Sequence, residues 1–95
     1  MAYSINFNEE KNQLLKATRG VCFEDVIDAL EKKRLIADIS HPNKKYVHQR
    51  LYVVEISGYA YAVPYVVNEN KQEIFFKTMY ASRVLTAKYI KKGKI

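Results

Sequence analysis

Both histidines of the chain lie within one basic segment, which runs from His41 to Arg50 and includes His48. Three cations and a tyrosine accompany them: Lys44, Lys45, Arg50 and Tyr46. Imidazole titrates near neutral pH, while lysine and arginine side chains bind polyanions. The segment therefore suits acid–base chemistry on a phosphodiester, and equally electrostatic binding without chemistry. A solvated loop is the alternative interpretation.

Two helices are expected before this segment. Asn8 suits the N-cap of a helix that runs to about Thr18, with acidic residues in the first turn and Gly20 after its end. A second helix is expected from about residue 23, because apolar residues recur there at the spacing of one buried helix face. Those residues are Phe23, Val26, Ile27 and Leu30, and the cations that close the helix are Lys32, Lys33 and Arg34.

Strands are expected from residue 35 onward, because the sequence becomes rich in Val, Ile, Tyr and Phe, which half-buried pleated surfaces favour. The four expected strands are 35–40, 50–57, 59–67 and 73–79. Within the third of them, Pro64 cannot donate a ladder hydrogen bond, which predicts an edge position or a bulge there. Ser82 then predicts the cap of a final helix over about 83–92. The expected fold is α+β, with two N-terminal helices packed on an antiparallel four-stranded sheet and a C-terminal helix, in a single domain of residues 1–95.

Composition limits the classes of protein to which the chain can belong. Its 48% hydrophobic residues argue against a disordered chain, and no apolar run approaches the length of a membrane span. The start of the chain lacks a signal-peptide pattern, which favours a cytoplasmic protein. A lone cysteine, Cys22, cannot form an internal disulfide and is interpreted as structural rather than nucleophilic. One cysteine and two histidines complete no zinc spacing, so neither a metal nor a cofactor is expected.

The net charge of +6 is unevenly distributed along the chain. Residues 1–31 carry three cations and six acids, whereas residues 32–95 carry thirteen cations and four acids. The second part is therefore the part expected to face a polyanion such as RNA. The residues expected to bind RNA through their charge are Lys44, Lys45, Lys88, Lys91 and Lys92. A generally basic surface that binds nothing is the alternative, since lysine-rich surfaces are common.

Three stretches carry a resemblance to a known family. They read F-N-E-E-K-N over 7–12, R-G-V-C-F-E-D-V over 19–26 and K-T-M-Y-A-S-R-V-L-T over 77–86. In order and spacing they resemble the W-D-x-x-K-x-x-x-N, K-H-G-V-S-F-E-E-A and R-I-I-S-A-R-x-A-T stretches of the BrnT-type toxins of bacterial type II toxin–antitoxin systems. The chain departs from the family pattern where His48-Gln49-Arg50 stands in place of E-x-R, and where one extra residue precedes Arg83. These departures are compatible with a divergent subfamily that has its own catalytic residues.

The resemblance implies a RelE-like ribonuclease fold and a toxin that cleaves RNA without a metal. It also implies a cognate antitoxin protein as partner, contact with operator DNA only through that antitoxin, and no membrane partner. The catalytic candidates are His48, Arg50, Lys77, Tyr80 and Arg83.

Each candidate has an expected role in cleavage and a plainer alternative. Arg50 and Arg83 suit phosphate clamps, because the guanidinium group offers fixed, paired donors. Lys77, expected on one strand face with Phe75 and Met79, suits charge stabilisation or proton transfer. The alternative for these cations is a solvated strand edge or a surface ion pair.

The remaining candidates are two groups that can transfer protons. His48 is the preferred acid or base, whereas His41, followed by Pro42, is expected in a structural turn. Tyr80 can stack on a base or donate a proton. The rival interpretations of the whole chain are a non-catalytic nucleic-acid-binding domain that uses the same basic face and an interaction module for an acidic protein.

Overall fold

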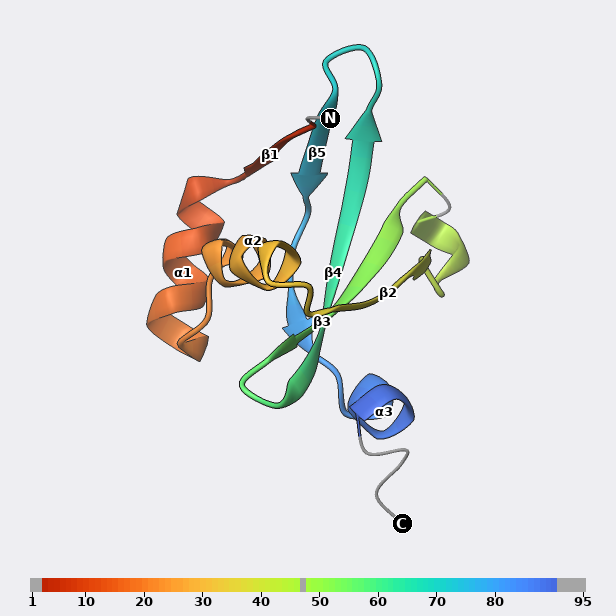
Figure 1. Cartoon of the computed structure of the whole chain (residues 1–95). Helices are drawn as coiled ribbons and strands as arrows, with labels where there is room; N and C mark the ends of the chain where they lie inside the picture. Colours follow the sequence, from red (N-terminus) through yellow and green to blue (C-terminus); the bar gives the residue numbers. More distant parts are fainter. Residues whose placement is uncertain (1–2, 47, 91–95) are drawn as a thin grey trace.

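The computed structural model describes residues 3–46 and 48–90, which form an α+β fold (Figure 1). The N-terminal elements are β1 (Ser4–Phe7), α1 (Glu9–Arg19) and α2 (Phe23–Glu31). The middle of the chain forms β2 (Leu35–Ser40), a 3₁₀ turn (Lys44–Tyr46), β3 (Arg50–Ile56) and β4 (Tyr59–Asn68). The last elements are β5 (Glu73–Phe76), β6 (Tyr80–Ala81) and α3 (Arg83–Leu85), which continues as a π-helical turn (Thr86–Ile90).

The sheet is mixed and larger than the four antiparallel strands expected from the sequence. Its strand order is β1-β5-β4-β3-β2, with β6 pairing to β4, and β1 runs parallel to β5. The α+β class is therefore confirmed, while the four-stranded antiparallel sheet is corrected. The strand β1 was not predicted from the sequence. It has four residues, and its partner strand lies far along the chain, with Ser4 paired to Glu73. A short strand with a distant partner has too few residues for its own pattern to be distinct.

Local capping explains where the first helix begins and ends. The Asn8 side chain accepts a hydrogen bond from the Lys11 backbone N–H at 2.9 Å, which satisfies a free donor of the first turn. Gly20 follows the last turn with φ of 71°, in the left-handed region that glycine adopts without steric cost. Both expected boundaries of α1 are thus confirmed to within one residue.

A bulge interrupts the pairing opposite Pro64, and its extra residue lies in segment 77–79. Of the two outcomes that the sequence predicted for Pro64, an edge position or a bulge, the structure therefore has a bulge, although in the partner segment rather than in β4. Tyr65 pairs with Phe76, but Ala62 pairs with Tyr80, so the segment 77–79 places three residues opposite the two residues of segment 63–64. Pro64 has no N–H for this ladder, and its carbonyl accepts the Lys77 N–H at 2.8 Å. The expected strand over 73–79 is corrected, because β5 ends at Phe76 and the chain resumes pairing only at β6.

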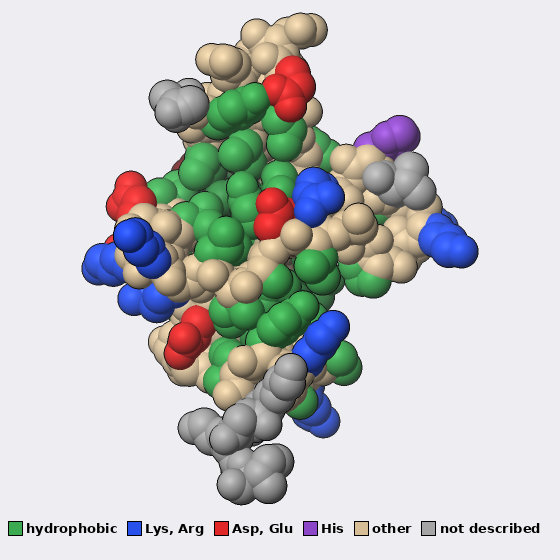
Figure 2. All heavy atoms as spheres, turned by 45° about the vertical axis from the view of Figure 1, so that its right-hand side comes forward, with side chains coloured by type: hydrophobic (Ala, Val, Ile, Leu, Met, Phe, Trp, Pro, Cys, Tyr) green, Lys and Arg blue, Asp and Glu red, His purple; other side chains and the backbone are tan. Residues whose placement is uncertain are grey.

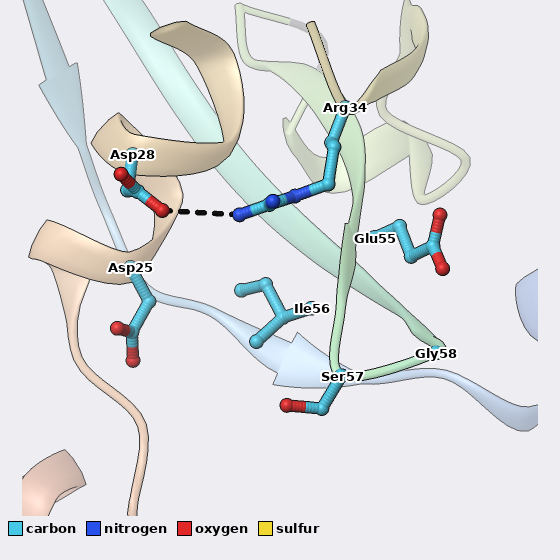
Figure 3. A pocket seen from close by; sticks show the side chains of 7 residues that line it. All are labelled: Asp25, Asp28, Arg34, Glu55, Ile56, Ser57 and Gly58. Atoms are coloured by element: carbon cyan, nitrogen blue, oxygen red, sulfur yellow. Dashed lines mark hydrogen bonds and ion pairs between the residues drawn. The ribbon is translucent and has the colours of Figure 1, made fainter. Parts of the chain in front are cut away.

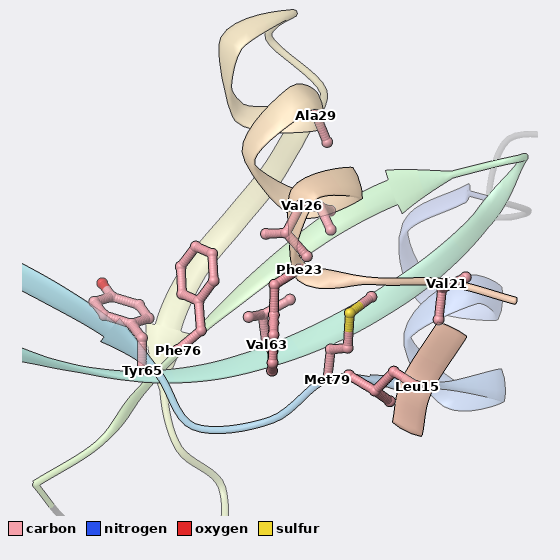
Figure 4. Packing of buried hydrophobic residues seen from close by; sticks show 10 residues of the cluster. Leu15, Val21, Phe23, Val26, Ala29, Val63, Tyr65, Phe76 and Met79 are labelled. Atoms are coloured by element: carbon pink, nitrogen blue, oxygen red, sulfur yellow. The ribbon is translucent and has the colours of Figure 1, made fainter. Parts of the chain in front are cut away.

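The main core lies between the two N-terminal helices and one face of the sheet (Figure 4). Phe23, Val26 and Ala29 of α2 are fully buried against Val63 of β4 and Phe76 of β5. Complete burial of a side chain as large as phenylalanine stabilises the fold by about 1.5–3 kcal/mol relative to exposure. The side chains of β3 alternate, so that Val54 faces this core while its neighbour Val53 faces the other side.

A smaller cluster on the opposite face seats the C-terminal helical segment. Leu51, Val53, Ala60 and Ala62 are buried there, with Leu85 and Tyr89 packed against them. Thr86 is also buried, and its hydroxyl accepts the Ala60 N–H at 2.9 Å while donating to the Ser82 carbonyl at 2.7 Å. These hydrogen bonds fix the position of the C-terminal helical segment against the beginning of β4.

Candidate nucleic-acid interface

A hollow of about 450 Å³ opens beside the Pro64 bulge, and we call it the basic hollow. Its charged and aromatic lining consists of Lys11, His41, Tyr46, Lys77 and Tyr80. Its remaining lining residues are Asn43, Gln49, Pro64 and Thr78. None of these lining residues carries a carboxylate. The hollow therefore presents two ammonium groups and several hydrogen-bonding groups, as a phosphate site requires.

The bulge determines where Lys77 lies. Lys77 follows the end of β5 at Phe76, and its side chain is exposed, with its Nζ 5.6 Å from the centre of the Phe75 ring. Lys11 reaches the same place from α1, where its Nζ donates to the Lys77 carbonyl at 3.3 Å. The expected buried-face position of Lys77, on a strand with Met79, is therefore wrong. Its membership of the predicted site is supported by the hollow that it lines.

Hydrogen bonds within the 41–49 segment organise the opposite wall of the basic hollow. The Nδ1 atom of His41 accepts the Asn43 N–H at 3.1 Å, and the His41 ring packs on Tyr46 with centroids 4.9 Å apart. A ring whose Nδ1 accepts a hydrogen bond carries its proton on Nε2 in the neutral form. His41 is thus suited to donate a hydrogen bond to an anion. The turn expected at Pro42 is present, and it brings His41 to the hollow.

Arg50 lies on the other face of the sheet and is already paired. Its Nε contacts the Asp38 carboxylate at 3.1 Å, and its Nη2 donates to the Asp38 carbonyl at 2.9 Å. Tyr65 donates to the same carboxylate at 2.6 Å. The hydrogen bond that Arg50 donates to Asp38 is the largest cause that raises the pKa of Arg50. Burial is the largest cause that raises the pKa of Tyr65, and its hydrogen bond to the Asp38 carboxylate comes second. Arg50 therefore has to leave Asp38 before it can clamp a phosphate.

The structure brings together only part of the predicted catalytic set. Lys77 and Tyr80 share the basic hollow, but His48, Arg50 and Arg83 do not line it. Arg50 and Lys77 do not belong to neighbouring strands, since β4 separates β3, which begins at Arg50, from β5, which ends before Lys77. His48 is exposed in the turn before β3, and Arg83 is exposed in the first turn of α3.

The lysines predicted to bind RNA lie on two sides of this region. Lys44 and Lys45 are exposed on the 3₁₀ turn, next to Tyr46 of the hollow. Lys88 is exposed on the C-terminal turn, with its Nζ 5.2 Å from the Tyr89 ring centre. Lys91 and Lys92 lie outside the described residues.

Several lining residues were not among the residues predicted to form the site: Lys11, Asn43, Tyr46 and Gln49, although Tyr46 was part of the basic segment 41–50. Lys11 lies in the acidic first third of the chain and on an expected helix, so its position in the sequence does not indicate a polyanion site. The polar residues of 43–49 stood out only by their closeness to the two histidines. No pattern in the sequence indicates that α1 and the 41–49 segment meet at the bulge.

Cys22 is half-buried at the start of α2, where its backbone N–H donates to Asp25 at 3.0 Å. Burial, the largest cause, raises the pKa of its thiol. A raised pKa reduces the thiolate population, which supports the structural interpretation of this residue.

Two further hollows differ from the basic one in chemistry. The acidic hollow, of about 440 Å³, is lined by Asp25 and Asp28 of α2 and by Arg34, Glu55 and Ser57 (Figure 3). A smaller aromatic hollow includes Tyr3, Tyr52 and Tyr65, and the last two rings stack on each other with centroids 4.0 Å apart. Figure 2 shows hydrophobic side chains gathered over the middle of one face, with Lys and Arg mostly at its margin.

No protein-family model, curated protein or solved structure matches the chain. Within residues 3–46 and 48–90, no helix is long and apolar enough to cross a membrane. In the same described part, no group of three or more His, Cys, Asp and Glu side chains is placed to hold a metal ion.

Proposed function

We propose that this protein is a toxin-class endoribonuclease that cleaves RNA without a metal and holds the RNA phosphate in the basic hollow. The observation that carries the proposal is the meeting of Lys11, Lys77, His41 and Tyr80 around a hollow whose lining lacks carboxylates. The family resemblance of the sequence supplies the expectation of cleavage. The hollow supplies the residues to test.

The lysines are proposed to bind the phosphate and to stabilise its transition-state charge. Neither Lys11 nor Lys77 forms an ion pair with a carboxylate in the described part of the chain. An ammonium group without a carboxylate partner gives up less interaction energy when it takes an external anion. Removing one preorganised donor that stabilises transition-state charge lowers kcat by about 10²–10³ in enzymes where this has been measured.

Protonation of the leaving 5′-oxygen is assigned to the hydroxyl of Tyr80, while solvent water takes the proton of the attacking 2′-hydroxyl and returns a proton to Tyr80. His41 is assigned as a hydrogen-bond donor to a phosphate oxygen. The Nδ1 atom of His41 is engaged by the Asn43 N–H, so this imidazole is better placed to donate from Nε2 than to accept a proton. His48, Arg50 and Arg83 are proposed to contact neighbouring parts of the RNA strand. Lys44, Lys45 and Lys88 extend the positive surface on both sides.

A cognate antitoxin is proposed to neutralise the protein by covering the same basic surface. Such a partner needs acidic side chains, because the two lysines of the hollow attract anions of any source. Operator DNA is proposed to contact the complex only through the antitoxin.

The test is cleavage of a labelled single-stranded RNA in EDTA by the wild type and by the double variant Lys11→Gln/Lys77→Gln. The expected result is cleavage by the wild type and a loss of about 100-fold or more in the variant. The control is Lys16→Gln/Lys71→Gln, which removes two exposed lysines outside the basic hollow and lowers the net charge equally. Equal cleavage by both double variants contradicts the assignment of the site.

A second candidate is a non-catalytic RNA-binding domain that uses the same hollow. It is favoured by the engaged Nδ1 of His41 and by the lack of a carboxylate base among the lining residues. Binding that weakens as salt rises, together with intact RNA after long incubation in EDTA, identifies this function.

A further inference from the structure

An apolar groove of about 330 Å³ lies next to the basic hollow, on the side toward α3. Its apolar lining consists of Ile39, Pro42, Leu51, Tyr80, Val84 and Leu85. Leu51 is 1% exposed and Val84 is 75% exposed, so the groove runs from a buried floor to an open rim. A volume of this size is at the lower end of the range for pockets that hold small organic groups.

Tyr80 joins the two cavities, because it lines both the groove and the basic hollow. β6 fixes its backbone, where Tyr80 pairs with Ala62 of β4, while its side chain stays 37% exposed. An anion in the hollow and an apolar group in the groove are therefore neighbours across one aromatic ring. A nucleotide combines these two parts in one covalent unit.

We propose that the groove is a subsite for one unpaired nucleobase of the RNA strand whose phosphate occupies the basic hollow. The inference rests on the proposed function and names its substrate class as single-stranded RNA. Bases stack on aromatic and apolar side chains when they are free of a duplex. Paired bases remain within the duplex stack, so double-stranded RNA presents no base to this groove.

Charge favours this occupant over an apolar segment of a protein. The groove lining adds Lys88 and no carboxylate to the cations of the neighbouring hollow. Arg83 and Lys88 are both exposed on the helical segment that forms one wall. A nucleobase attached to a phosphodiester backbone satisfies both the apolar surface and the positive rim.

The groove is expected to accept different bases with similar affinity. Ser82 is its main side chain for reading base edges, and the Ser82 Oγ already accepts the Leu85 N–H at 3.1 Å as the helix cap. Stacking on a ring and on aliphatic walls depends little on the identity of the base. The groove therefore selects unpaired RNA rather than a base sequence.

The experiment compares three fluorescent probes of equal length by anisotropy titration: single-stranded RNA, the same strand with abasic sites, and duplex RNA. Wild-type protein is expected to bind the single strand about 5- to 150-fold more tightly than the abasic strand, the range that one stacked base provides. Tyr80→Ala is expected to lose most of this difference between the normal and the abasic strand. Tyr80→Phe keeps the ring and is expected to retain the preference.

The matched control is Tyr3→Ala, because Tyr3 is also 37% exposed but lines the aromatic hollow instead. Circular dichroism verifies that each variant is folded. If the wild type binds normal and abasic strands equally, or if Tyr80→Ala keeps the preference, the base subsite is overturned, and a protein partner becomes the remaining occupant of the groove. If the wild type binds none of the three probes, the proposed function fails as well.

Discussion

The acidic hollow and the basic hollow have nearly the same volume and opposite charge. In the acidic hollow, Asp28 contacts Lys32 at 3.2 Å and Arg34 at 3.0 Å, so its charge is partly neutralised by neighbouring residues. In the basic hollow, Lys11 and Lys77 have backbone and ring contacts but no carboxylate partner in the described structure. The negative charge of the first hollow is thus partly balanced within the protein, whereas the second hollow is the one that we propose to bind an external anion.

The two hollows also show that the charge balance of a stretch of sequence does not predict the charge of the surface to which its residues contribute. The first 31 residues are acidic, yet Lys11 from this part completes the basic hollow. The basic remainder of the chain supplies Glu55 to the acidic hollow. Local charge is therefore set by the elements that meet in space, and only its overall sign is set by composition.

Charge reversal in the two hollows gives the largest expected contrast. Lys11→Glu/Lys77→Glu is expected to weaken single-stranded RNA binding by about 100-fold or more, since like charges at a binding site cost several kcal/mol. Asp25→Lys/Glu55→Lys reverses two charges of the acidic hollow and is expected to leave binding unchanged or stronger. Anisotropy titration at a fixed salt concentration measures both. Similar losses in the two double variants contradict the separation of the two sites.

The next prediction concerns the stability of the fold and the buried side chain of Asn12. This residue connects α1, which carries Lys11 of the basic hollow, to α2, which carries Asp25 of the acidic hollow. It is fully buried, accepts the Phe23 N–H at 2.7 Å and donates to Glu24 at 2.8 Å. Asn12→Leu leaves the buried Phe23 N–H without a partner, so the free energy of unfolding is expected to fall by about 1–3 kcal/mol. Urea unfolding checks this value.

The control for Asn12 is Gln13→Leu on the exposed side of the same helix. Its stability is expected to stay within about 0.5 kcal/mol of the wild type. Equal loss in the two variants contradicts a special role for the buried amide.

The smallest expected effect concerns pH and the ion pairs of Asp28. The hydrogen bond that Asp28 accepts from Lys32 is the largest cause that lowers the pKa of Asp28 in the folded state, and Arg34 lowers this pKa further. A lowered folded pKa gives stability that is present above the unfolded pKa of about 3.9 and is lost as pH falls through the folded pKa. Arg34→Met is therefore expected to flatten the decline of stability below about pH 4, whereas Lys77→Met leaves that decline unchanged. Urea midpoints between neutral and acidic pH measure the slopes, and identical slopes in the two variants exclude the assigned role of Arg34.

Much of the fold follows from local sequence signals. Asn8 and Gly20 determine the ends of α1, apolar periodicity determines α2, and Pro64 indicates the bulge, because each acts through neighbouring backbone groups. β1 was missed because its only strand partner is β5, nearly seventy residues later. The end of β5 at Phe76 was missed because the bulge depends on the register with β4.

The candidate site was likewise predicted only in part from the sequence. Lys77 and Tyr80 were identified from the sequence, and the basic hollow contains both. Arg50 was predicted to clamp a phosphate because of its guanidinium group, but it is paired with Asp38 and does not line the basic hollow. Lys11 and His41 joined the site because α1 and the 41–49 segment converge on the bulge.

The sequence by itself determined the first two helices, the main strands, the excess of positive charge and the kinds of groups available for phosphate chemistry. These properties depend on residue type and on spacing over a few positions. The final helix, expected over about 83–92, is α-helical only over Arg83–Leu85 and continues as a π-helical turn over Thr86–Ile90. Only the tertiary structure decided which cations are neutralised by carboxylates and which remain available to an anion. Pairing between distant segments depends on strand order and register, which local periodicity does not specify.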